Sequence, residues 1–287
     1  MKRPAIFGLI LAAALVGTAF VARPQAPAPN DLKGGDSKGG DGKAKAKGAA
    51  KGGNVGLYQR QPPAPAGPAP KLADGTPDLS GVWLGSGSND SDISRGLKPG
   101  ESVVMLPWAE EVVKNRQSKD DPEANCLPSG VPRGSPYPWR IAQTPGIYLI
   151  VYEGNIHSWR QIFMDGRKHP DADELIPSWY GHSVGRWEGP TWVVDTVGFN
   201  AKFWFDYKGH PHTEQLHTVE RYTRTDLGNM NIEVTIDDPG AYAKPFTTVG
   251  RARIMAGTEL LEYICQEDNF DLQHISGPAQ GPGGSTR

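Results

Sequence analysis

Hydrophobic and polar residues alternate with a period of two along most of the chain beyond residue 145. These stretches are rich in Val, Ile, Thr and aromatic residues, a composition typical of β-strands that bury one face. Turn sequences such as Asp165-Gly166 and Ala256-Gly257 separate them. The pattern predicts strands at Ile147–Glu153, His157–Met164, His182–Trp187, Thr191–Val197, Glu214–Thr225, Asn231–Asp237, Pro245–Ile254 and Glu259–Gln266.

One segment, Leu106–Lys119, has helical features instead. Pro107 fits the first turn of a helix, Glu110 its positive end and Lys114 its negative end. Short strands joined by brief loops favour an antiparallel meander, and closure into a barrel would remove the exposed edges. The sequence therefore predicts an all-β, up-and-down barrel with one short helix, and a β-sandwich is the alternative.

The start of the predicted domain adds detail to the barrel. It contains Gly81-Val82-Trp83, and lipocalin-type barrels begin with a Gly-x-Trp strand whose Trp closes one end. This resemblance implies a lipocalin-like barrel.

The N-terminus has the features of a secretory signal peptide over residues 1–22. Met1-Lys2-Arg3 is basic, and residues 4–22 are uncharged and end in small side chains. An uncleaved membrane anchor is the alternative, because the run is nearly the length of about 20 residues that spans a bilayer. We expect a periplasmic or extracellular protein.

Residues 23–75 and 276–287 differ in composition from the rest. They are rich in Gly, Lys, Pro and Ala and have few large apolar side chains. Such segments cannot bury enough surface to offset their ordering entropy, so we expect a disordered linker and tail around a barrel domain at 76–275. The linker is interpreted as a spacer, and its lysines allow a weak contact with an anionic envelope.

Charge divides the chain in the same way. Residues 1–75 carry 11 Lys/Arg against 4 Asp/Glu, whereas residues 76–287 carry 19 against 28. An acidic domain is a poor nucleic-acid binder, so we expect no nucleic-acid partner. We also expect a monomer.

The chain has two cysteines, Cys126 and Cys265. An even number in an exported protein favours a disulfide, here joining the loop after the helix to the last predicted strand. Two free buried thiols are the alternative.

Several segments of the predicted domain together resemble a large family of exported, mostly uncharacterised proteins of environmental bacteria. The resemblance implies a secreted β-rich domain over residues 76–270. No activity is established for that family, so no residue role is carried over. Pro190 departs from the Asp that usually follows the Trp-Glu-Gly turn. The segments are Pro77–Trp83, Ser178–Gly189, Val193–Phe199, Glu214–Tyr222, Ile232–Tyr242 and Leu261–Cys265.

Histidines on predicted strands are candidates for acid–base chemistry. His182 and Arg186 share one face of their strand, and if that face lines the barrel, both side chains project into its cavity. A histidine beside a carboxylate can act as a general base near neutral pH. The candidate catalytic residues are His182 and His217 as bases, with Glu214 or Glu220 as the carboxylate.

Ligand-binding candidates follow from charge and aromatic content. Arg186 or Arg160 could hold an anionic group of a ligand, although cross-strand ion pairs are the simpler interpretation of these arginines. Aromatic side chains such as Tyr180 suit a cavity for planar ligands. Trp204 lies in Phe203-Trp204-Phe205, which either packs over the barrel mouth or presents a binding patch.

His212 and Glu214 are two residues apart and could contribute to a metal site. The spacing does not match the cupin metal motif, and a polar loop is the simpler interpretation. We therefore expect no metal and no other cofactor.

These observations predict an exported β-barrel that binds a small apolar or aromatic molecule in an aromatic-lined cavity. The alternative is a cofactor-independent hydrolase, lyase or isomerase that uses a His–carboxylate pair. An envelope-associated structural module is a third possibility.

Overall fold

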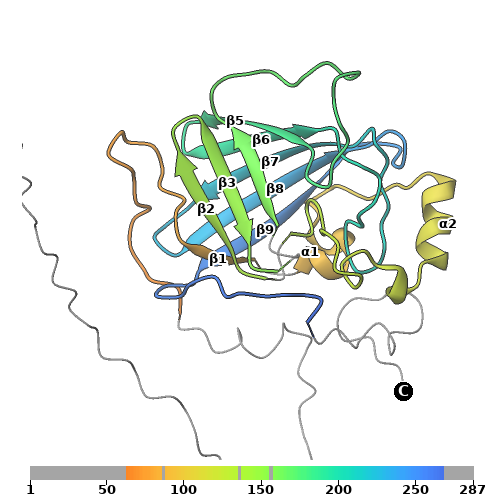
Figure 1. The fold of residues 1–287 in the computed structure, drawn as a ribbon, viewed down its shortest axis with the longest axis horizontal. Helices are drawn as coiled ribbons and strands as arrows, with labels where there is room; N and C mark the ends of the chain where they lie inside the picture. Colours follow the sequence, from red (N-terminus) through yellow and green to blue (C-terminus); the bar gives the residue numbers. More distant parts are fainter. Residues whose placement is uncertain (1–62, 86–87, 135–136, 155–157, 268–287) are drawn as a thin grey trace, which may run out of the picture. The chain divides into compact units, whose positions relative to one another are not determined.

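The computed structural model describes residues 63–85, 88–134, 137–154 and 158–267 (Figure 1). In this part of the chain, nine strands pair in sequence order, and the last pairs with the first to close a barrel. The strands are β1 (Val82–Gly85), β2 (Trp139–Thr144), β3 (Ile147–Tyr152), β4 (Trp159–Phe163), β5 (His182–Glu188), β6 (Thr191–Val197), β7 (His217–Arg224), β8 (Asn229–Asp237) and β9 (Phe246–Ile254). The helices are α1 (Ser88–Ser91), η1 (Ile93–Gly96), α2 (Pro107–Asn115) and η2 (Ser118–Asp120).

The strand order confirms the predicted up-and-down barrel, and the β-sandwich alternative is wrong. One pair departs from the meander, because β4 and β5 run parallel and share only the pairs Ile162–Ser183 and Phe163–Val184. The long connection between these two strands, residues 164–181, passes over the outside of the barrel (the green loop in Figure 1). Every other neighbouring pair is antiparallel.

Two details of the strand prediction are wrong. The sequence pattern missed β2, a short strand that follows a proline-rich stretch. The predicted strand Glu259–Gln266 is irregular instead. Because β1 and β9 already pair, the closed ring offers this segment no edge. It is held by other contacts: Leu261 donates its N–H to Glu153 Oε2 at 2.8 Å, and Tyr263 stacks on Tyr137.

Trp83 closes one end of the barrel, as the Gly-x-Trp resemblance implied. Its ring is completely buried, stacks on Trp139 and donates its Nε1–H to the carbonyl oxygen of Leu79 at 2.9 Å. Arg224 lies over the Trp83 ring at 4.9 Å and donates to the carbonyl oxygens of Asp78 and Leu227 at 2.6 Å. The guanidinium thus pairs backbone carbonyls that would otherwise be left unsatisfied at this end.

The other end is packed by a second hydrophobic cluster, in which loop residues meet the start of β9. Phe203, Trp204 and Phe205 are all buried there, which an irregular backbone permits and a strand would not. Trp204 lies under the guanidinium of Arg116 at 4.5 Å. Of the two interpretations of this segment, the structure shows packing over the barrel end rather than an exposed patch.

Both ends of the described chain are tied to the barrel. Leu227 donates its N–H to the carbonyl oxygen of Gly67 at 2.9 Å, so the hydrogen-bonded chain begins before residue 76, where we expected the folded domain to start. Cys126 and Cys265 form the predicted disulfide. The predicted signal peptide, most of the linker and the tail lie outside the described residues. None of the described helices has the length and hydrophobicity needed to cross a bilayer.

Candidate functional site

Strand alternation decides which predicted site residues lie inside the barrel. On β5 the interior face carries Ser183, Gly185 and Trp187, and Trp187 packs on the main core. The opposite face, with His182 and Arg186, therefore points outward. The condition under which these two side chains would project into the barrel, that their face lines it, is therefore not fulfilled. Arg186 is exposed and pairs with Glu188 at 2.6 Å.

A charged pair lies inside the barrel instead. Arg160 on β4 and Glu220 on β7 are both buried, and Nη2 of Arg160 is 2.5 Å from Oε2 of Glu220. Arg160 also donates to the hydroxyls of Ser183 at 3.1 Å and Thr196 at 2.6 Å, and Tyr222 donates to Glu220 at 2.6 Å. Burial disfavours the charged guanidinium, but Glu220 outweighs it and raises the pKa of Arg160 above its ordinary value.

A small cavity of about 70 Å³ borders Glu220 of this pair. Its wall includes Trp139, Tyr152 and Tyr222 together with Glu220 and Asp90. The volume falls well below the roughly 300–1,000 Å³ of pockets that hold drug-sized ligands. The lumen is aromatic-lined as predicted, yet its own side chains fill most of it.

Several buried polar atoms around this cavity have no hydrogen-bond partner among the described residues: Oδ2 of Asp90, Nε1 of Trp139 and Oγ1 of Thr248. Burial, with a further contribution from Glu123, raises the pKa of Asp90 to about 8. Such a carboxyl is protonated near neutral pH and can donate as well as accept a hydrogen bond. The cavity therefore suits water or a very small polar molecule better than an aromatic one.

A larger groove of about 520 Å³ lies where β4 and β5 meet. Its walls are mainly apolar and come from β4 and from the connection to β5: Trp159, Phe163, Leu175, Ile176, Trp179 and Tyr180. Trp159 is 57% exposed and Ile176 is 87% exposed. The groove exists because only two residue pairs join these parallel strands, which leaves the rest of the seam uncovered.

The groove and the interior pair meet at two contacts. Arg160 and Ser183 line the groove and also belong to the buried network, so they form its inner end. Tyr180 of the groove stacks on Tyr152 of the lumen, with ring centroids 5.6 Å apart. Nη1 of Arg160 has no partner among the described residues. The apolar groove thus ends at two residues of the buried polar network.

A chain of four polar side chains runs along the outer face from the groove. Nδ1 of His182 is 2.8 Å from Nδ1 of His169, and Nε2 of His169 is 3.1 Å from Oδ1 of Asp195. The same carboxylate oxygen is 2.9 Å from Nε2 of His217. Hydrogen bonding to His217 lowers the pKa of Asp195 and, reciprocally, raises that of His217. Burial, with His169, lowers the pKa of His182.

The two predicted histidines thus belong to one chain, but their carboxylate is Asp195. Glu220 lies on the interior face of β7 and pairs with Arg160, whereas His217 lies on the exterior face. Glu214 is exposed in the turn before β7. Sequence analysis did not single out His169, because it lies in an irregular connection without strand periodicity. The one feature of the sequence that could have indicated His169 is its position 13 residues before His182, in the segment that leads back to the sheet.

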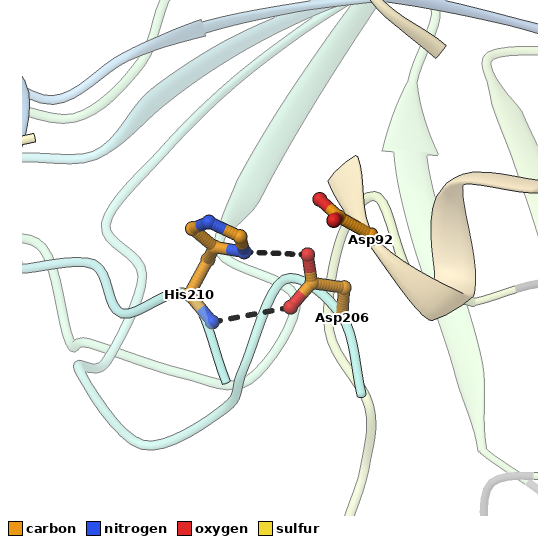
Figure 2. Close-up of side chains that lie close together, drawn as sticks. All are labelled: Asp92, Asp206 and His210. Atoms are coloured by element: carbon orange, nitrogen blue, oxygen red, sulfur yellow. Dashed lines mark hydrogen bonds and ion pairs between the residues drawn. The ribbon is translucent and has the colours of Figure 1, made fainter. Parts of the chain in front are cut away.

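A cluster of potential metal ligands consists of Asp92, Asp206 and His210, shown in Figure 2. The oxygens of Asp206 accept from the N–H groups of Ile93, Gly209 and His210 and from Nδ1 of His210. Asp92 accepts from Ser94 and pairs with Lys208. Because these oxygens already have partners, the cluster is best explained as a set of hydrogen bonds and ion pairs that holds η1 against the 206–210 loop.

The other metal alternative, His212 with Glu214, is not assembled. The His212 ring packs against Phe203 and Phe205, and burial lowers its pKa to about 4. Glu214 is exposed. Among the described residues, the only potential metal group includes neither.

Comparison with known proteins adds little to this description. No family model matches the chain, and no curated protein matches it. A solved structure, the crystal structure of a mutant of the fluorescent protein UnaG, aligns with 14% sequence identity and a TM-score of 0.26. The alignment covers 50% of this chain and 90% of that one. A TM-score this low supports no conclusion about this protein, so the description of its fold and sites depends on the geometry given above.

Proposed function

We propose that the protein binds a small apolar or aromatic molecule in the groove between β4 and β5. The observation that carries this proposal is the groove itself, whose volume of about 520 Å³ lies within the range of small-molecule sites. It exposes the large aromatic surface of Trp159 to solvent. Covering such surface with an apolar ligand is favourable, at roughly 25 cal/mol per Å² removed from water.

The inner end of the groove supports a preference for a ligand with one polar end. Arg160 is charged, and its Nη1 lacks a partner among the described residues. A buried donor without a partner costs about 1–3 kcal/mol, which an acceptor oxygen of a ligand would recover. The ligand class is therefore an aromatic or apolar body that carries a carbonyl, carboxylate or similar oxygen.

We also propose that the protein acts outside the cytoplasm as a monomer. The disulfide between Cys126 and Cys265 supports an oxidising compartment. The basic start of the chain and its apolar run support export. The lysine-rich linker would then hold the barrel at a distance from an anionic envelope surface, with at most weak contact.

The binding proposal is tested with the oxidised full chain and 1-anilinonaphthalene-8-sulfonate, an aromatic probe with one anionic group. We expect saturable fluorescence enhancement with one site per chain. Trp159→Ala should weaken binding about tenfold, equivalent to about 1.4 kcal/mol. The side chain is largely exposed, so its removal should leave the fold intact.

Trp108→Ala is the matched control. Trp108 is an exposed tryptophan on α2 and does not line the groove. The Trp108→Ala variant should bind the probe with the same affinity as the wild type. Equal affinities of wild type and Trp159→Ala, or an equal loss in both variants, would overturn the assignment of the site to this groove.

A further inference from the structure

The outer chain His182–His169–Asp195–His217 has a direction that its hydrogen bonds determine. Asp195 is ionised, as its lowered pKa indicates, and a carboxylate only accepts hydrogen bonds. Nε2 of His169 must therefore donate to it. When His169 is neutral, its Nδ1 is unprotonated and accepts from Nδ1–H of His182. The remaining nitrogen of His182, Nε2, carries a free electron pair.

That nitrogen belongs to a residue that lines the groove. The His182 ring stacks on Phe163 at 5.2 Å, and Phe163 is part of the apolar wall. No described residue forms a hydrogen bond to Nε2 of His182, and the atom is not among the buried polar atoms. The basic nitrogen thus belongs to a residue in the wall of a groove whose size and apolar lining suit an aromatic ligand.

We propose that His182 is a general base toward a ligand bound in the groove, and that His169 and Asp195 are the positioning residues that set its tautomer. The inference rests on the proposed binding function and deepens it. It assigns to the site a proton-transfer activity on aromatic molecules that carry an acidic C–H beside a carbonyl group. Neither His169 nor Asp195 needs to touch the ligand.

The proposed step balances within the site. Nε2 of His182 takes the proton, and the electron pair of the broken C–H bond moves into the adjacent carbonyl to give an enolate. The positive charge on His182 is stabilised through His169 by the Asp195 carboxylate, as in other histidine–aspartate arrangements. In a ligand with a C=C bond β,γ to the carbonyl, the enolate is conjugated with that bond. Return of the proton to the γ-carbon moves the double bond next to the carbonyl and regenerates neutral His182, without a cofactor or co-reactant.

Charged groups around the chain favour a neutral His182. Arg167 lies over Phe163 at 3.8 Å, and its charge, after burial and His169, contributes to the lowered pKa of His182. At the far end Asp237, with Asp195, helps to raise the pKa of His217. The first proton to bind as pH falls is thus expected at His217, which leaves His182 free as a base near neutral pH.

Nitrogen-15 NMR of the histidine rings in the full chain tests the direction of the chain. At about pH 8 we expect His182 protonated on Nδ1, the less common tautomer of free histidine. Asp195→Asn should reverse the chain, because an amide N–H can donate to His169. His182 would then carry its proton on Nε2. In the serine protease triad, the same aspartate-to-asparagine change likewise leaves the histidine in the wrong tautomer.

Glu188→Gln is the matched control for this measurement. It makes the same carboxylate-to-amide change at the end of β5, where Glu188 forms ion pairs with Arg186 and Arg221, and should leave the His182 tautomer unchanged. An Nε2–H tautomer in the wild type would overturn the proposal. Stoichiometric Zn²⁺ binding that removes the His182 proton would do the same, since it would identify the chain as a metal site.

Turnover is tested with 5-nitrobenzisoxazole, a planar aromatic carbon acid. A base removes its C3 proton, the C–H electrons form the C≡N bond, and the N–O bond breaks to release a coloured phenolate. We expect kcat/KM to follow one histidine ionisation and to fall at least about tenfold in His182→Gln and Asp195→Asn, a modest share of the roughly 10²–10⁴-fold of general bases.

The two proposals fail in different ways. If the sulfonate probe binds with Trp159-dependent affinity but wild-type turnover does not exceed that of free imidazole, His182 is not the base and the binding function stands. If the wild type does not bind the probe at all, the binding function fails first. Trp159-dependent probe binding in the wild type, together with turnover that is lost in His182→Gln, supports both.

Discussion

Strands β5, β6 and β7 present two polar sets on opposite faces of the same sheet. Inside lie Ser183, Thr196 and Glu220, which surround the guanidinium of Arg160. Outside lie His182, Asp195 and His217, which His169 joins into one chain. On two of these strands the interior and exterior members are adjacent in the sequence, so an offset of one residue separates two different kinds of site.

The difference between the two sets is access to water. The interior pair is fully desolvated, so its charges are held by each other and by hydroxyl groups. The exterior chain is only partly buried. Burial lowers the pKa of His182, whereas Asp195 raises the pKa of His217. The inner set therefore contributes to stability, whereas the outer set can exchange protons.

The largest effect is expected inside the barrel. Glu220→Gln removes one partner of the buried pair and leaves Arg160 with an uncompensated charge, which should cost about 3–5 kcal/mol of unfolding free energy. The double variant Arg160→Met/Glu220→Leu should recover most of it. Urea unfolding of the wild type and the two variants measures both values. A loss below about 1 kcal/mol in the single variant would contradict the desolvated pair.

A smaller effect is expected from the hydroxyl groups. Thr196→Val removes an acceptor from Arg160 Nη2, which should cost about 2 kcal/mol because the donor is charged. Thr223→Val is the exterior control, since the Thr223 hydroxyl lies 2.8 Å from the Thr191 hydroxyl on the partly exposed face, and should cost below about 0.5 kcal/mol. Equal losses in urea unfolding would remove the contrast between the two faces.

The smallest effect is the pH dependence of the outer chain. The folded-state pKa of His217 is raised by Asp195, so its contribution is complete below the unfolded value of about 6.5 and is lost as pH rises through the folded value. His217→Asn should therefore cost more at about pH 6 than at about pH 9, by roughly 0.5 kcal/mol for this partly exposed pair.

His182 is expected to behave in the opposite way. Its folded-state pKa is lowered by burial, so the neutral ring is favoured and stability falls as pH drops below about 6.5. His182→Asn should remove that loss. Unfolding curves for both variants at the two pH values check the signs. If the unfolding free energies of His182→Asn and His217→Asn changed with pH in the same way, the pKa values of the two histidines would not be shifted in opposite directions.

The alternation of polar and apolar residues was sufficient to predict the barrel, and for Thr191–Val197 it gave the strand bounds of β6. It could not tell which face of β5 is inside. That depends on other strands, because Met164, Ile162 and Trp192 fill the space next to Gly185. A Cβ there would overlap Sδ of Met164, so only the face with the small residues fits inward.

The candidate site was less predictable than the fold. The groove follows from the parallel pairing of β4 and β5, which period-two alternation does not encode. His169 and Trp179 lie in the irregular connection between β4 and β5, where the spacing of residues along the sequence does not indicate which way a side chain points. Asp195 could be identified as the carboxylate of the outer chain only once the pairing of β6 with β7 placed His217 beside it.

Closure of the ring also determines when the protein can finish folding. The pairing of β1 with β9 brings Trp83 to Ile254, so the loop to be closed spans most of the domain. A growing chain therefore has two open strand edges until its ninth strand has been synthesised. During that interval the edges can pair with other chains, and only the arrival of β9 ends the exposure.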